Sequence, residues 1–113
     1  MYNKLKKGIK MLSKTNFTPI LDSLFEHPSV YAVVISNQEG FPLAFRSSDA
    51  SFGSDEAELV AALVSSLVGK AVHVVTKLDR GKVNFFTIDS VKGEILIALE
   101  TDYVVIAMKK RRG

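Results

Sequence analysis

The chain has 113 residues, of which 47% are hydrophobic and 24% charged, a composition typical of one globular domain that excludes a low-complexity scaffold or a large two-domain enzyme. It contains no cysteine, so disulfides, thiolate catalysis and Cys-ligated metal sites are excluded. No apolar segment follows the N-terminal lysines as in a signal peptide, no apolar run is long enough to suggest a membrane span, and we expect a cytoplasmic protein.

The net charge of +3 is concentrated at the two ends of the chain. The remaining sequence holds six basic residues against all twelve acidic ones, so the isoelectric point of 9.2 describes the termini. We therefore divide the chain into a basic N-terminal helix or tail (1–15), a folded domain (16–109) and a basic C-terminal tail (110–113). The basic residues that we expect to make tail contacts are Lys4, Lys6, Lys7, Lys10, Lys14, Lys109, Lys110, Arg111 and Arg112.

Two helical patterns open the sequence. Leu5, Ile9 and Leu12 form a narrow apolar stripe among the lysines, as in a short amphipathic helix. A second short helix begins at an Asn16 or Thr18 cap and ends before Pro28.

Residues 30–36 and 41–47 then predict an antiparallel hairpin, because they are rich in β-branched and aromatic residues. The connecting turn ends at Gly40, which can adopt a positive φ. Pro42 lacks a backbone donor, so the second strand is expected at an edge of the sheet.

The longest element is a helix predicted from Ser54, its expected cap, to about Leu78, ending before the glycine at position 81. Its apolar residues fill a face wider than one contact with a sheet requires. These residues are Val60, Leu63, Val64, Leu67, Ala71, Val74, Val75 and Leu78, with Ala61, Val68 and Val72 on one flank.

Three more strands are predicted at 82–89, 94–100 and 103–109. The last two are apolar on both faces, which is typical of central strands covered on both sides. The expected fold is an α/β sandwich with a five-stranded antiparallel sheet, a long helix on one face and short helices on the other.

Three passages of this sequence resemble the roadblock/LAMTOR family, also called roadblock-type dynein light chains. They are VYAVVISNQEGFPLAF, the long helix from Ser54, and GEILIALETDYVVIAM, in which Asp102-Tyr103 precedes the last strand. The resemblance covers residues 17–109. It implies a profilin-like sheet and a homodimer or heterodimer in which the long helices and third strands meet.

A stripe of small residues supports a dimer independently, because Ala57, Ala61, Ser65 and Gly69 recur every four residues and would let a second helix approach closely. The alternative is that these small residues lie beneath a crowded loop. An apolar third strand at an edge would also need a partner. The predicted interface comprises Ala57, Ala61, Ser65, Val68, Gly69, Val72, Val83, Phe85 and Thr87.

Catalytic motifs are not recognisable. His27 and His73 lack partners at metal-ligand spacing, and Gly69-Lys70 lacks the upstream glycine and following hydroxyl of a phosphate loop. We therefore predict no enzyme activity, no catalytic residue, no metal and no cofactor.

The predicted function is that of a dimeric scaffold or regulator, and the resemblance implies that its partner is a small Ras-like GTPase. The chain would pair with itself or with a paralogous roadblock protein. The alternative is an adaptor subunit of a motor-like or membrane-associated complex acting through the basic tails. The tails are expected first to aid solvation, and next to contact a membrane or an acidic partner. Nucleic acid ranks last, because Tyr2 is the only aromatic residue in either tail.

Overall fold

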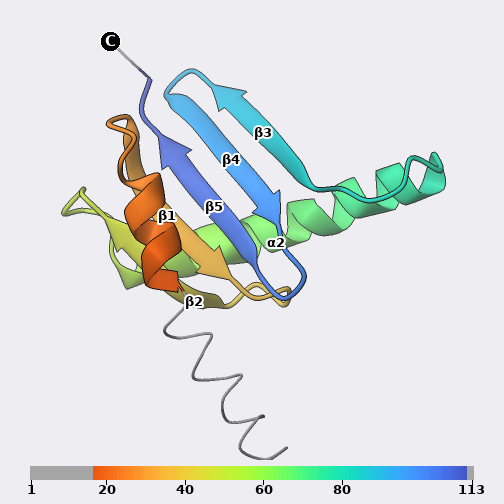
Figure 1. Cartoon of the computed structure of the whole chain (residues 1–113), viewed down its shortest axis with the longest axis horizontal. Coiled ribbons are helices and arrows are strands. Elements are labelled where there is room, and N and C mark those ends of the chain that lie inside the picture. Colours follow the sequence, from red (N-terminus) through yellow and green to blue (C-terminus); the bar gives the residue numbers. More distant parts are fainter. Residues whose placement is uncertain (1–16, 112–113) are drawn as a thin grey trace, which may run out of the picture.

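The computed structural model describes residues 17–111, and the predicted helix or tail at 1–15 and Arg112 lie outside these described residues. Five strands form one antiparallel sheet in the order β2-β1-β5-β4-β3, with α2 on one face and a short helix over residues 17–24 on the other (Figure 1). The predicted fold class is confirmed. The elements are β1 (Val30–Ser36), β2 (Pro42–Ser47), α2 (Ser54–Lys77), β3 (Phe85–Ser90), β4 (Gly93–Leu99) and β5 (Val104–Lys109).

The predicted hairpin is present, and its turn depends on two residues. Asn37 Oδ1 accepts hydrogen bonds from the backbone N–H groups of Glu39 and Phe41, and Gly40 has a φ of +93°. A Cβ atom at Gly40 would lie 2.7 Å from the Oγ of Ser65 on α2. Glycine therefore allows both the turn conformation and the close approach of the turn to the helix.

We expect Gly40→Ala to lower the free energy of unfolding by roughly 1–2 kcal/mol, because alanine disfavours a positive φ and its methyl group meets Ser65. Urea unfolding measures this loss. In a second variant, Ser65→Ala, the hydroxyl is gone, so adding Gly40→Ala there should cost less. An equal cost in both backgrounds would mean that only the backbone conformation matters.

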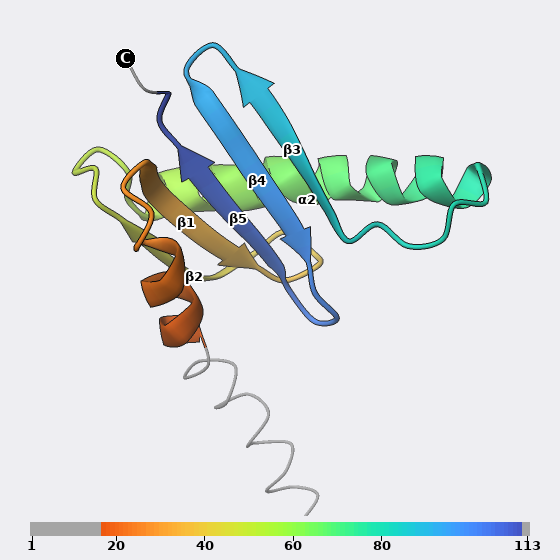
Figure 2. The ribbon, with the colours of Figure 1, turned by 45° about the horizontal axis from the view of Figure 1, so that its top comes forward.

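The sheet lies between α2 and the short helix (Figure 2), and a hydrophobic cluster packs on each of its two faces. On the side of the short helix, Phe17 and Leu21 pack with Val33 and Ile35 of β1. On the side of α2, Val34 of β1 packs with residues from β4 and β5. Successive residues of β1 thus point to opposite clusters, which explains why the central strands are apolar on both faces.

The long helix approaches the sheet through its smallest apolar residues. Ala57 and Ala61 are fully buried and Val64 nearly so, whereas most of the large residues of the predicted broad face are exposed, including Leu63 and Val74. Small side chains allow the helix axis to lie close to the strands, so the side bearing them becomes the sheet contact.

The N-cap of α2 differs from the sequence prediction, whereas the helix ends where predicted, at Lys77 with Leu78 as its C-cap. The N-cap is Gly53 rather than Ser54, and the Gly53 N–H donates to Glu56 Oε1 at 2.8 Å. At the other end Asp79, not a glycine, first adopts a positive φ, of 56°. Asparagine and aspartate tolerate this conformation better than most non-glycine residues, so the helix can end at Lys77, four residues before Gly81.

The C-terminal turns of α2 project beyond β3 (Figures 1 and 2). By length and mean hydropathy, 1.8 over its most apolar window, α2 could also cross a membrane. Such a helix is weak support for a span, and here it contributes Ala57, Ala61 and Val64 to the core. The mean hydropathy of α2 is high because the helix is apolar on two sides, one that packs on the sheet and one that is exposed.

Candidate interaction surface

The first candidate surface is the apolar side of α2 that faces away from the sheet and is exposed in the described part of the chain. Leu59 and Leu63 are 60% and 62% exposed, and the side chains continue along the helix at spacings of four and seven residues. Projected at 100° per residue, this side lies well away from Ala61, which faces the sheet. We call it the α2 stripe, and it consists of Leu59, Leu63, Leu67 and Val74 of α2 together with Leu78, the C-cap residue.

The second feature is the outer edge of β3. Within residues 17–111, β3 pairs only with β4, so one row of its backbone N–H and C=O groups has no strand partner. Phe85 is 55% exposed and Thr87 is also exposed, whereas Phe86 and Ile88 pack toward α2. An open edge with apolar side chains on both faces is a ready site for pairing with another strand.

The structure corrects the predicted helix interface at two positions. Ala57 and Ala61 are buried under the chain's own sheet, so their side chains cannot contact a partner. Ser65 lies against Gly40, which agrees with the alternative that the small residues lie beneath a loop. Of the remaining predicted positions, Gly69, Val72, Phe85 and Thr87 are exposed, and Val68 and Val83 are half-buried.

The predicted interface does not include Leu59 or Leu63, although Leu63 belongs to the predicted broad apolar face. The signal in the sequence was the width of that face, which is more than one sheet can cover. The predicted interface also omits Leu43 and Phe45 of β2, the other edge strand, and Phe41 just before it, and all three are exposed. Successive side chains of an edge strand point to opposite faces of the sheet, but this alternation does not indicate which of the two faces the rest of the chain covers.

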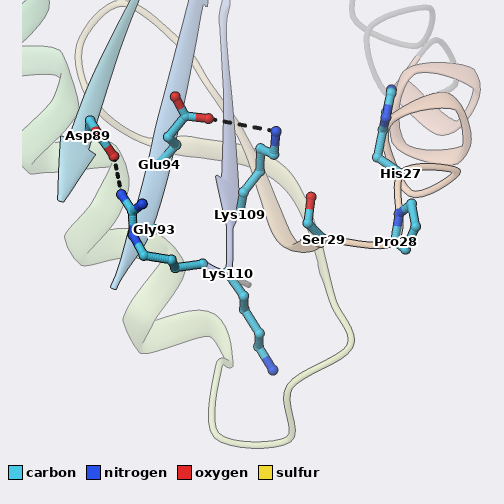
Figure 3. Close-up of a pocket in the computed structure, with 9 residues that line it drawn as sticks. His27, Pro28, Ser29, Asp89, Gly93, Glu94, Lys109 and Lys110 are labelled. Atoms are coloured by element: carbon cyan, nitrogen blue, oxygen red, sulfur yellow. Dashed lines mark hydrogen bonds and ion pairs between the residues drawn. The ribbon is translucent and has the colours of Figure 1, made fainter. Parts of the chain in front are cut away.

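The basic residues at and just after the end of β5 line one part of an open cavity of about 540 Å³, which Asp89, Glu94 and His27 also line (Figure 3). Lys109 Nζ lies 3.7 Å from Glu94 Oε1, and Arg111 forms an ion pair with Asp89. Lys110 Nζ lies 5.4 Å from the centre of the Tyr31 ring. These three predicted tail residues therefore already have partners within the domain, and Lys109 belongs to β5 rather than to a tail.

Titratable side chains do not converge into a catalytic arrangement within the described part of the chain. His27 and His73 are both exposed, and residues 17–111 contain no group of three His, Asp or Glu placed to hold a metal ion. In the β2–α2 loop, hydrogen bonds from the backbone N–H and the hydroxyl of Ser51 lower the pKa of Asp49. These bonds shape an exposed turn, since Asp49 lines none of the apolar surfaces.

A five-stranded antiparallel sheet between a long and a short helix, with an apolar helix stripe near an open strand edge, defines a small α/β interaction domain. The chain belongs to the Roadblock/LC7 domain family, whose model matches residues 18–110. The recognised family is thus confirmed. Among curated proteins, none matches the sequence significantly.

Solved structures share the fold at low sequence identity. A Roadblock/LC7 domain from Streptomyces avermitilis is 17% identical with a TM-score of 0.70, and the match covers 81% of this chain and 76% of that one. The gliding protein MglB from Thermus thermophilus is 9% identical with a TM-score of 0.74, covering 87% and 73%. MglB from Myxococcus xanthus is 11% identical with a TM-score of 0.76, covering 88% and 73%.

Proposed function

We propose that this protein is a non-enzymatic dimeric scaffold that binds or modulates a small Ras-like GTPase. Membership of the Roadblock/LC7 family supports a role as a regulator or adaptor in general, since roadblock domains are generally non-catalytic. The observation that carries the proposal is the α2 stripe, an exposed apolar surface on a helix that lies behind the open-edged sheet. We further propose a cytoplasmic location.

The dimer would pair each α2 stripe and each β3 edge with those of a second copy or of a paralogous roadblock protein. Leu59 and Leu63 would be covered by the partner's stripe and the β3 edge would be paired, which removes exposed apolar surface and an unpaired strand edge in one step. A similar solved structure shows MglB in a tetrameric arrangement, which supports assembly as a property of this fold. The joined domains would present a continuous surface to the GTPase.

We expect light scattering to give a dimeric mass for the full chain and a monomeric mass for Leu63→Arg, because the charge would be buried unpaired at the centre of the stripe. The matched control is Ala62→Arg, an exposed position about 100° away around the helix, which should remain dimeric. A monomeric wild type would contradict homodimer formation, and a dimeric Leu63→Arg would contradict pairing through the stripe.

Binding to a GTPase is tested by titrating the purified protein with small Ras-like GTPases from the same organism, each loaded with GDP or a non-hydrolysable GTP analogue. Binding that depends on the nucleotide supports the proposal. Failure to bind any of them in either state would overturn the function and leave the fold unaffected.

The adaptor alternative is less well supported by the described residues. It depends on the basic residues of both tails, and two of these, Lys109 and Arg111, are paired with Glu94 and Asp89. Steep salt dependence of complex formation, lost on removing residues 1–14 and 109–113, would favour it over the scaffold.

A further inference from the structure

One face of the sheet is only half covered by the described residues. The short helix over residues 17–24 packs mainly on β1 and β5, and Figures 1 and 2 show no helix over β4 and β3 on that side among the described residues. Phe85 of β3 is largely exposed there, and Leu96 and Ala98 of β4 are partly exposed. This area lies on the opposite face of the sheet from α2.

The uncovered area contains an apolar groove of about 210 Å³ beside the short helix. Its floor comes from alternate residues of the strands, because these point to the same face. We call it the β3–β4 groove, and it is lined mainly by Leu24, Phe85, Leu96, Ala98, Val105 and Ala107. Such a groove favours a ligand with a narrow apolar stripe.

The chain enters the described fold next to this groove. The Phe17 ring packs edge-on against Tyr103, with centroids 5.2 Å apart. Tyr103 immediately precedes β5, whose Val105 lines the groove. A helix of sixteen residues is about 24 Å long, whereas the distance from β5 to β3 across the sheet is only about 10 Å. Residues 1–16 are therefore long enough to cross it.

The sequence of that segment complements the groove. Its apolar residues Leu5, Ile9 and Leu12 share one narrow helical face, and five lysines surround them with no acid present. Asp89 of β3 and Glu94 of β4 lie on the same sheet face as the groove, by alternation from Phe85 and Leu96, and they pair with Arg111 and Lys109. The complementarity is therefore between a narrow apolar stripe and an apolar groove, and the lysines on either side of the stripe would face solvent.

We propose that residues 1–16 fold back as an amphipathic helix whose Leu5, Ile9 and Leu12 fill the β3–β4 groove of the same chain. This helix completes the second layer beside the short helix and converts the half-covered sheet into a fully covered one. The proposal does not depend on the GTPase or on the dimer, since it concerns the face opposite α2.

A disulfide cross-link tests the contact directly, because the chain has no cysteine of its own. In the full chain carrying Ile9→Cys and Ala98→Cys, mild oxidation should produce an intramolecular bond, seen as a faster-migrating species of monomeric mass on a non-reducing gel. The matched control combines Ile9→Cys with Ser66→Cys on exposed α2, across the sheet, and should not cross-link. No bond in the first variant, or equal bonding in both, would overturn the proposal. A bond only between two chains would assign the groove to the segment of a second copy and overturn it as well.

Thermal unfolding gives an independent result. The full chain carrying Leu5→Ser, Ile9→Ser and Leu12→Ser should lose about 5 °C or more in Tm, because three buried apolar side chains become polar. Met11→Ser, which lies off the stripe, should change Tm by no more than about 1 °C. An unchanged Tm in the triple variant, at the same oligomeric mass, would overturn the proposal.

Discussion

Replacing Gly93 with alanine is expected to leave little folded protein. Gly93 opens β4 with a φ of +139°, a conformation essentially restricted to glycine. A Cβ atom at this position would lie 1.9 Å from the carbonyl oxygen of Lys109 on the neighbouring strand. The atoms nearest to this Cβ belong to the backbone of Lys109 and Arg111, and backbone atoms cannot move aside as the end of a flexible side chain can. We expect Gly93→Ala to cost more than about 3 kcal/mol, a large part of the roughly 5–15 kcal/mol that stabilises a domain.

The measurement is urea unfolding followed by circular dichroism, with Gly81→Ala as the control. Gly81 also has a positive φ, of 90°, but a Cβ atom there would have no neighbour within 4 Å. Its alanine variant should lose only about 1 kcal/mol, from the backbone conformation alone. Equal midpoints for the two variants would show that the approach of β5 to Gly93 does not constrain that residue.

Enlarging Ala61 to leucine is the second change with a large expected effect. Ala61 is fully buried where α2 meets the sheet, in the cluster that contains Val34 and Ile106. Three additional carbon atoms must displace the helix or force neighbouring side chains off their rotamers, at a cost of about 1–3 kcal/mol. Thermal unfolding should show a Tm lower by roughly 5–15 °C.

The adjacent residue provides a matched control for this experiment. Ala62 is exposed, so Ala62→Leu makes the same chemical change without crowding the core. Its stability should stay within about 0.5 kcal/mol of the wild type. A similar loss of stability in both variants would mean that the contact of α2 with the sheet tolerates added volume.

Much of the fold could be predicted from local patterns. Residues 30–36 form β1 with the expected bounds, and Gly40 has the positive φ that its turn requires. Pro42 correctly indicated an edge strand, and the apolar runs of β4 and β5 correctly indicated central strands. These features depend on the backbone limits of single residues or on hydrophobic periodicity, both of which can be read without tertiary structure.

The orientation of α2 could not be predicted in the same way. Its apolar residues surround more than half of the helix, so periodicity does not say which part meets the sheet. From the sequence, the side of α2 with small residues, including Ala57, is predicted to contact a partner. In the structure that side packs on the sheet, and Leu63 is exposed. The choice depends on how closely the helix can approach the strands, which is a tertiary property. The same limit applies to the β3–β4 groove, which arises only when the strands are assembled.

The projection of α2 beyond β3 has a consequence for the amount of protein in a cell. A helix of 24 residues is about 36 Å long, whereas five strands span only about 19 Å between their outer axes, so one protomer cannot shelter the whole helix. In the proposed dimer, the partner supplies the missing cover. A copy synthesised without a partner would then be the less stable species, and quality-control proteases remove such species first. The steady-state level of this chain should therefore follow the supply of its partner, because protomers that find no partner are degraded and paired protomers are kept.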